Sequence, residues 1–446
     1  MTAPAIELAP QQAEAVDRAL TWWRGIHDGD SKQQVFRLFG YAGTGKTTIA
    51  QHIVSELGVK RVEYAAFTGK AAYVLRSKGC YGASTIHSLI YLPAEKARAK
   101  LRELKEQLET ANPADRIVLE RQIKLELQRL ETPSWILRDP EETDLATADL
   151  LVIDEVSMVG ETMAADLLSF GVPTLVLGDP AQLPPVDGGG YFIDAPADHL
   201  LTDIHRSALD SPVTRLATAV RGSQPGDRAY GIPTPDGDSG RRDHLTIPEL
   251  LTYDQVLVGT NAMRWQAVHL LRSLRGHVGP TPVPGDRVIA LANSTDCEVF
   301  NGQQFRVESC QGHPTHDDRL RLAVVDDEGN QRHLTTWRAG FKDLEGEKLA
   351  KREGRGAVAA LTFAQAITTH KAQGSQWDRV LVVDEAATFA WIAEKETART
   401  RRSAGLPDWG ESAAAGRLNG QRWLYTALTR AAQQVTIIPR LRGVLR

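Results

Sequence analysis

The sequence of 446 residues has few cysteines and no long apolar run. Its three cysteines, Cys80, Cys297 and Cys310, are odd in number and lack metal-ligand spacing, which argues against a disulfide framework or a zinc module and predicts a reduced, cytoplasmic location. Apolar runs such as residues 150–153 fall far short of the ~18 residues that a membrane span needs. No basic segment followed by an apolar stretch opens the chain, so we expect neither a secretory signal nor a membrane protein.

Positive charge is also in short supply. Lysine and arginine total 52 and aspartate and glutamate total 56, so the formal net charge is −4. A protein that binds nucleic acid through its overall charge would be basic, so any such role must depend on local sites. With 42% hydrophobic and 24% charged residues, the composition is that of a folded chain with a buried core, long enough for about three domains.

Short apolar, β-branched runs alternate with helical stretches in two parts of the chain. In the first part, these runs are residues 35–39, 62–66, 150–153 and 174–177. In the second part, they are residues 255–258, 364–368, 380–383 and 435–438. This alternation is typical of parallel sheets covered by helices on both faces, so the sequence predicts two α/β units.

Two stretches interrupt this pattern. Residues 95–131 are dense in charged side chains, with spaced leucines and a break at Asn112-Pro113, which predicts two antiparallel helices projecting from the first unit. A solvated hairpin without chemistry of its own is an equally good interpretation of this segment. Turn sequences between short alternating runs over residues 280–341 predict a small antiparallel β-barrel or sheet in the second unit.

Residues 40–47 form the sequence GYAGTGKT, a complete phosphate-binding loop between a predicted strand and a predicted helix. Its glycines allow backbone N–H groups to surround phosphates at a helix N-terminus. We expect Lys46 to reach the β- and γ-phosphates and Thr47 to ligate Mg²⁺. A chance glycine turn is disfavoured, because strand, loop and helix are all in register.

Carboxylates and an amide follow the next strands of the same unit. Asp154 and Glu155 come directly after residues 150–153, at the edge where parallel sheets bind their ligands. We expect Asp154 to hold Mg²⁺ and Glu155 to activate the attacking water. Gln182, in a proline-rich segment, could sense the γ-phosphate or lie in a simple turn. Arginines stabilise phosphoryl transfer, but physical arguments alone select none of the many in this chain.

Eight ordered segments resemble superfamily 1 helicases of the 5′→3′ RecD/Dda-like branch, superfamily 1B, and especially the phage Dda type. They are GYAGTGKTT, FTGKAA, STIHSL, VIDEVSM, LGDPAQLPPV, IHR, THKAQGSQWD and YTALTRA. The resemblance implies an α/β fold of two RecA-like P-loop NTPase domains, with a helical insert in the first and an SH3-like β-barrel insert in the second. The implied ranges are 1–87 and 149–205 for the first motor domain, 88–148 for its insert, 206–279 and 361–446 for the second motor domain, and 280–360 for the barrel.

The resemblance also implies residue roles at the nucleotide. Gln12 matches the adenine-recognition element, and Gln182 matches the γ-phosphate sensor. Arg206 and Arg430 match the arginines that the second domain brings to the γ-phosphate. Further nucleotide contacts are expected from Gly43, Thr44, Gly45, Lys46, Thr47, Thr48 and Gly374. Many relatives carry glutamate where this chain has Gln376, an exchange that would relax nucleotide preference if that carboxylate contacts the ribose.

Contacts to single-stranded DNA are implied on both motor domains. The expected residues are Thr68, Lys70, Thr85 and His87 on the first and Asn261, Thr369, His370 and Lys371 on the second. Hydroxyls, lysines and backbone amides suit sequence-independent contact with phosphates. Two such grips whose separation changes with ATP would produce stepwise movement, and a narrow lined channel needs few cations.

The base of the first insert offers two aromatic side chains, Tyr91 and Trp135, as candidates for the wedge that splits a base pair. Packing of both rings against the domain is the better-supported alternative, because aromatic side chains contribute most when they are buried. A rigid wedge in residues 88–148 is the feature that would separate a helicase from a motor that only translocates.

The resemblance therefore implies an ATP-dependent DNA helicase that uses Mg²⁺, moves 5′→3′ on single-stranded DNA and acts as a monomer. Its implied partners are single-stranded DNA and its junctions with duplex, with a single-strand-binding protein or replisome components as further candidates. Replication, repair and recombination, in a bacterium or a phage-infected host, are the implied settings. Two alternatives stay open: a motor subunit that remodels protein–DNA complexes without unwinding alone, and a helicase that acts on RNA.

Overall fold

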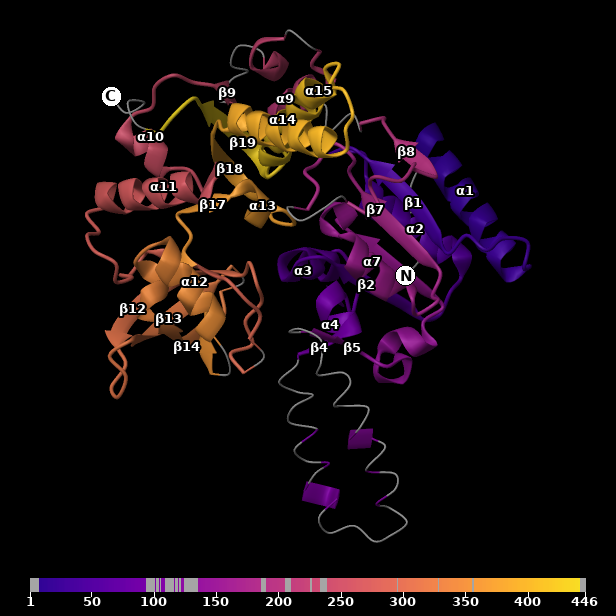
Figure 1. Ribbon diagram of the computed structural model, residues 1–446, viewed down its shortest axis with the longest axis horizontal. Coiled ribbons are helices and arrows are strands. Elements are labelled where there is room, and N and C mark those ends of the chain that lie inside the picture. The colour runs from indigo at the N-terminus through magenta and orange to yellow at the C-terminus, as the bar shows by residue number, and fades with distance from the viewer. Residues whose placement is uncertain are drawn as a thin grey trace.

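The structure is a computed structural model of the chain (Figure 1). It describes residues 8–93, 135–185, 190–204, 210–224, 227–232, 239–294, 296–327, 329–354 and 357–441, with a few isolated positions between 101 and 123. Figure 1 shows two α/β units side by side and a smaller β unit next to the second of them. None of the described helices has the length and apolar character needed to cross a membrane.

The first α/β unit is a fully parallel sheet of six strands. These are β1 (Val35–Gly40), β2 (Val62–Ala66), β3 (Ser84–Thr85), β6 (Leu150–Asp154), β7 (Thr174–Gly178) and β8 (His199–Leu201). The strand order is β3-β2-β6-β7-β1-β8, and every pairing is parallel. Around the sheet lie α1 (Pro10–His27), α2 (Lys46–Leu57), α3 (Gly69–Ser77), α4 (Ile86–Ile90), η3 (Val156–Met158) and α7 (Glu161–Leu168).

Alternate side chains of the central strand β6 enter two different cores, one on each face of this sheet. Leu150 and Val152 pack into a cluster that also holds apolar side chains of α1 and α2. Leu151 and Ile153 pack into the cluster that includes α4 and α7. Because both faces are covered, the strand must be apolar throughout, and its first charged side chain, Asp154, emerges only at the C-terminal edge.

The second α/β unit is a parallel sheet of five strands. These are β9 (Gly240–Arg241), β10 (Gln255–Val258), β17 (Ala366–Thr368), β18 (Trp377–Val383) and β19 (Ala431–Ile438). The strand order is β17-β10-β18-β19-β9, with every pairing parallel. Its helical elements are α9 (Pro212–Gly222), η4 (Arg228–Gly231), α10 (Ile247–Leu251), α11 (Asn261–Leu274), α13 (Thr369–Ala372), α14 (Ala386–Ser403) and α15 (Glu411–Leu428). The prediction of two α/β units is therefore confirmed.

The insert in the second unit is a six-stranded, mainly antiparallel sheet. Its strands are β11 (Arg287–Ala290), β12 (Gln304–Gly312), β13 (Arg319–Asp326), β14 (Gln331–Trp337), β15 (Val358–Ala359) and β16 (Leu361–Phe363). Between β14 and β15 the chain forms η5 (Arg338–Phe341) and the helix α12 (Leu344–Glu353). The order is β15-β14-β13-β12-β11-β16, so the two edge strands are consecutive in the chain and separated only by Ala360. This short connection requires the sheet to curl until its edges meet, which gives a near-closed barrel.

The barrel includes one strand more than the sequence assigned to it. β16 pairs with β11, with Val288 opposite Phe363, although we placed residues 361–446 in the second motor domain. The physical reason is closure of the sheet, because β16 supplies the edge next to β11. The chain returns to the parallel sheet only at β17.

The insert of the first unit begins and ends in an antiparallel pair, β4 (Tyr91–Pro93) with β5 (Trp135–Leu137). Two 3₁₀ turns, η1 (Pro140–Glu142) and η2 (Asp144–Thr147), lead back to the sheet. The isolated described positions between 101 and 123 are helical. The remainder of the two helices predicted over residues 95–131 lies outside the described residues.

Candidate nucleotide-binding cleft and nucleic-acid face

The phosphate-binding loop joins the end of β1 to the start of α2. Gly43 and Gly45 have φ angles of 81° and 79°, in the left-handed region that favours glycine, so the loop requires its glycines at these positions. The Lys46 ammonium folds back and donates to the carbonyl oxygens of Gly40 and Tyr41, at 2.7 and 3.1 Å. These bonds hold the lysine across the mouth of the loop, where it can meet a phosphate.

Two oxygen-bearing side chains, those of Thr47 and Asp154, meet beside this loop. The Thr47 hydroxyl donates to Oδ2 of Asp154 at 3.1 Å, and the Glu155 N–H donates to Oδ1 of the same carboxylate at 2.8 Å. Burial, with the neighbouring Glu155 carboxylate, raises the pKa of Asp154. Glu155 has a φ of 57°, a left-handed conformation that is uncommon for a non-glycine residue and is often found at functional sites.

This oxygen pair fits Mg²⁺, which prefers hard oxygen ligands and usually takes only one or two from the protein. A cation beside Asp154 would also favour the charged carboxylate that burial disfavours. Elsewhere in the described part of the chain, no group of three histidine, cysteine, aspartate or glutamate side chains could hold a metal ion.

The predicted adenine-recognition residue, Gln12, lies against the phosphate loop. Its buried side-chain amide accepts a hydrogen bond from the Ala9 N–H at 3.1 Å and donates to the Thr44 carbonyl at 3.3 Å. Thr44 is buried and bonded to the Tyr41 carbonyl, whereas Thr48 is exposed on α2. Gln12 therefore connects the first turn of α1 to the loop.

The predicted γ-phosphate sensor, Gln182, is buried next to the same edge of the sheet. Its Oε1 has no hydrogen-bond partner among the described residues, which leaves an acceptor for a ligand or water. Asp179, in the same segment, is also buried, and burial raises its pKa. Asp179 is an additional residue of the site that was not predicted, although its place directly after β7 puts it at the same edge as Asp154.

One of the two predicted arginines, Arg430, lies among the described residues. Arg430 is buried at the end of α15, and its guanidinium donates to the Thr426 and Ser375 carbonyls and to the Thr429 hydroxyl, at 3.2, 3.5 and 3.2 Å. These partners all belong to the second unit. Arg206 lies outside the described residues.

The predicted DNA contacts of the first unit begin two short helices. The hydroxyls of Thr68 and Thr85 cap α3 and α4 by accepting hydrogen bonds from the backbone N–H groups of Ala71 and Ser88, each at 3.1 Å. Each cap satisfies one backbone N–H in the first turn of its helix. Thr68 is partly exposed, whereas Thr85 is buried. His87 lies between the rings of Phe67 and Tyr91, and burial lowers its pKa.

Two of the four predicted DNA contacts of the second unit, Asn261 and Lys371, are joined by a buried ionic network. Glu347, from the barrel helix α12, accepts from Lys371 at 3.2 Å and from the fully buried Arg264. Arg264 in turn donates to the Asn261 side chain at 3.2 Å. Burial lowers the pKa of Lys371. The barrel insert therefore positions two of these residues, which sequence motifs did not indicate.

The remaining two DNA contacts predicted for this unit lie in α13. Thr369 is buried and donates to the Val258 carbonyl at 3.2 Å. His370 lies 5.8 Å from the Phe389 ring, and burial lowers its pKa.

Gly374, a predicted nucleotide contact, lies close to the start of α3. Its φ is 76°, and an added Cβ would lie 2.5 Å from the Thr68 hydroxyl and 3.0 Å from the Ala71 Cβ. Any side chain there would push the second unit away from α3. Gln376 donates to the Ala431 carbonyl at 3.3 Å, within its own unit.

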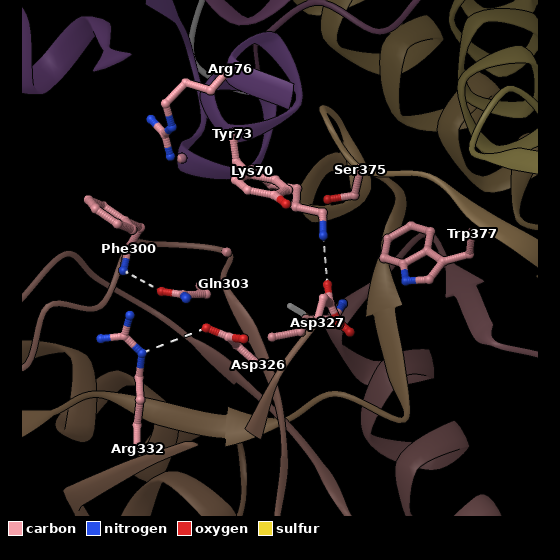
Figure 2. Close-up of a pocket in the computed structure, with 13 residues that line it drawn as sticks. Lys70, Tyr73, Arg76, Phe300, Gln303, Asp326, Asp327, Arg332, Ser375 and Trp377 are labelled. Atoms are coloured by element: carbon pink, nitrogen blue, oxygen red, sulfur yellow. Dashed lines mark hydrogen bonds and ion pairs between the residues drawn. The ribbon is translucent and has the colours of Figure 1, made fainter. Parts of the chain in front are cut away.

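A pocket of about 260 Å³ lies between α3 and the barrel. Figure 2 shows Lys70 and Tyr73 of α3 on one side of it and Phe300, Asp327 and Arg332 of the barrel opposite. The Lys70 ammonium forms an ion pair with Asp327 at 2.7 Å. A predicted DNA contact of the first unit is therefore already paired with a carboxylate of the barrel.

Comparison with known proteins assigns the family. The family AAA_30, described as AAA domain, matches residues 7–232, just over half of the chain. The chain belongs to the AAA domain family. Its AAA domain thus carries the phosphate loop, the Thr47–Asp154 pair and the buried Gln182, which are brought together at one edge of the first sheet.

Besides matching the family model, the chain with this AAA domain is similar to a curated helicase. It is 31% identical over 260 residues to the ATP-dependent RecD2 DNA helicase of Deinococcus radiodurans, an alignment that covers 53% of the chain and 33% of the relative. The chain therefore spans about a third of the length of this curated relative. The resemblance to RecD-like superfamily 1B helicases is confirmed.

One solved structure extends the likeness to the whole fold. A chain from a structure of two coordinating Pif1 helicases at forked double-stranded DNA has a TM-score of 0.50 and 17% identity, covering 97% of this chain and 92% of that one. The Pif1 helicase from Candida albicans has a TM-score of 0.49 and 18% identity, covering 99% and 96%. The first of these supports the predicted fold class, two RecA-like domains with a barrel insert.

The wedge candidates at the base of the AAA domain's insert have different outcomes. Tyr91 is buried and its hydroxyl donates to Asp166 at 2.5 Å, which favours the packed alternative. The side chain of Trp135 lies outside the described residues.

Proposed function

We propose that this chain is an ATP-dependent DNA helicase that moves 5′→3′ on single-stranded DNA and unwinds duplex DNA. The observation that carries the proposal is the position of the phosphate loop and the Thr47–Asp154 pair, at a sheet edge that contacts α15 of the second unit. A nucleotide bound there lies at the joint of two RecA-like units. The likeness to a DNA helicase adds support, and the activity of the whole protein is our proposal.

Hydrolysis is assigned to side chains at this joint. Lys46 exchanges the carbonyls of its own loop for β- and γ-phosphate oxygens, and Glu155 orients and deprotonates the attacking water. Oε1 of Gln182, which has no hydrogen-bond partner among the described residues, accepts a hydrogen bond from that water or from a group next to it. Arg206 and Arg430 supply positive charge from the second unit as the cleft closes.

The proposed metal site consists of Thr47 and Asp154. Magnesium bound there would supply charge neutralisation at the phosphate oxygens. The Thr47 hydroxyl and the Asp154 carboxylate are already within hydrogen-bonding distance, so the two ligands are positioned without a further change in their backbone.

We assign movement along DNA to groups on both units. Thr68 and Thr85 present helix N-termini on the first unit, and Lys371 lies beside the corresponding face of the second. Because ATP lies between the units, its binding and hydrolysis change the separation of the two grips. A monomer acting on single-stranded DNA and its junctions, in the cytoplasm, completes the proposal, with a single-strand-binding protein or replisome components as candidate partners.

Strand separation on tailed duplexes tests this function directly. We expect ATP-dependent unwinding of a DNA duplex with a 5′ single-stranded tail and none of the 3′-tailed or RNA duplexes. Unwinding only from 3′ tails would reverse the polarity, and unwinding only of RNA would change the substrate. DNA-stimulated ATP hydrolysis without any strand separation would instead identify a translocating motor subunit.

The Asp327→Asn substitution should strengthen binding of single-stranded DNA. Removing the carboxylate releases Lys70 for phosphate contact, and an exposed ion pair of this kind contributes about 0.2–1 kcal/mol, so affinity should rise up to roughly fivefold. Fluorescence anisotropy with a labelled oligothymidine at fixed salt measures the change. Asp318→Asn, which removes an exposed carboxylate of the barrel that pairs with Arg319 of the same sheet, is the matched control. Equal gains in both variants would contradict a specific role for Asp327.

A further inference from the structure

The hydroxyl of Tyr425 lies between two loops of the first unit, although the residue belongs to α15 of the second. It accepts a hydrogen bond from the Ala42 backbone N–H at 3.0 Å and donates one to Oδ2 of Asp179 at 2.7 Å. Ala42 is in the phosphate loop after β1, and Asp179 follows β7. Since β1 and β7 are neighbours, with Phe39 opposite Gly178, one oxygen atom joins two adjacent loops to a helix of the other unit.

Packing of the Tyr425 ring would not by itself require a hydroxyl at this position. The side chain is buried, and a buried hydroxyl is costly unless its hydrogen-bonding capacity is used. Here both the donor and the acceptor functions are used, and both partners lie across the boundary between the units. Burial and the Asp179 carboxylate raise the pKa of Tyr425, so the hydroxyl keeps the proton that it donates.

Neighbouring contacts reinforce the same link. The Arg221 guanidinium, at the end of α9 in the second unit, stacks 3.5 Å from the centroid of the Tyr41 ring in the phosphate loop. The Thr426 hydroxyl accepts from the Leu183 N–H at 2.9 Å, next to the segment of Asp179. The second unit therefore contacts two consecutive residues of the phosphate loop, Tyr41 and Ala42.

We propose that Tyr425 is a positioning residue that couples occupancy of the phosphate loop to the orientation of the second unit. This inference rests on the proposed function. Phosphates draw the loop's N–H groups inward, and a shift of Ala42 is transmitted through the Tyr425 hydroxyl to α15. Movement of α15 in turn displaces Asp179, which stands at the same edge as Asp154. Arg221 supports the link through its stack on Tyr41.

The Tyr425→Phe variant removes the hydroxyl and keeps the ring. Affinity for a labelled oligothymidine is measured without nucleotide and with a non-hydrolysable ATP analogue and Mg²⁺, and the ratio of the two dissociation constants reports the coupling. We expect a ratio different from one in the wild type and close to one in Tyr425→Phe. At saturating DNA, kcat should fall about tenfold, the equivalent of one hydrogen bond to a charged group, while KM for ATP changes less than threefold.

Tyr253→Phe is the matched control. Its hydroxyl is also buried, but it donates to Thr436 at 2.7 Å within the second unit, so its loss should leave both the ratio and kcat as in the wild type. Arg221→Gln, at a partly exposed position, provides a second variant that should also bring the ratio closer to one than in the wild type. Wild-type behaviour of Tyr425→Phe, or equal losses in Tyr253→Phe, would overturn the inference alone. A wild-type protein without DNA-stimulated ATP hydrolysis would overturn the proposed function, and the inference with it.

Discussion

Replacing Lys46 with alanine is expected to abolish measurable ATP hydrolysis while binding of single-stranded DNA changes less than threefold. The Lys46 ammonium lies across the mouth of the phosphate loop, held by the Gly40 and Tyr41 carbonyls. No other lysine belongs to this loop, so alanine leaves the developing charge on the phosphates without its ammonium. Loss of one well-placed electrostatic contact at a transition state costs roughly 100- to 1,000-fold in kcat.

The variant should keep its fold, because Lys46 is only partly buried at the first position of α2 and alanine is a good helix former. Phosphate release with and without single-stranded DNA measures the effect. Lys60→Ala removes an exposed lysine from the same unit and should behave as the wild type. DNA-stimulated turnover that survives in Lys46→Ala would mean that the hydrolytic site lies elsewhere.

The strands of the parallel sheets could be predicted because local patterns determine them. Residues 62–66 and 255–258 coincide with β2 and β10, since strands of a covered parallel sheet are mostly apolar. Every residue of β10 is buried, and the last two of β2 are. The predicted strands were shorter than the observed ones where a strand extends beyond the buried core. β18 begins at Trp377, and its first residues are exposed or partly exposed, so no apolar run marked them. The barrel strand β12 likewise continues past Val307 through residues that are exposed or partly exposed.

The candidate site could be predicted in part for a topological reason. The carboxyl ends of all the strands in a parallel sheet lie at one edge, which is why Thr47, after β1, and Asp154, at the end of β6, were expected together. The Thr47 hydroxyl and Oδ2 of Asp154 are 3.1 Å apart. Pairing between distant elements has no such local signal. Nothing in the sequence joins Lys70 to Asp327 or Tyr425 to Ala42, because these contacts depend on how the barrel and α15 pack against the first unit. The close approach of Gly374 to Thr68 and Ala71, across the boundary between the units, also has no local signal.

The largest expected loss of stability follows Asp286→Ala. This carboxylate is fully buried where the chain enters the barrel, and it accepts hydrogen bonds from Arg272 at 2.9 and 3.1 Å, from Gln365 at 2.6 Å and from the Val283 N–H at 3.0 Å. Arg272 belongs to α11 of the second unit, and Gln365 lies where the chain leaves the barrel. One carboxylate therefore fastens both connections of the barrel to the parallel sheet.

Alanine at residue 286 would leave the Arg272 guanidinium buried without its counter-charge, since its other hydrogen-bond acceptors, the Gly279 and Thr281 carbonyls, are neutral. Breaking a buried ion pair by removing one partner typically costs about 3–5 kcal/mol, and we expect the free energy of unfolding in urea to fall by that amount. Glu345→Ala removes the exposed partner of Lys348 and should cost no more than about 1 kcal/mol. Equal, small losses in the two variants would show that Asp286 does not hold the barrel. A large loss confined to Asp286→Ala would show that this carboxylate anchors the connections of the barrel to the second unit.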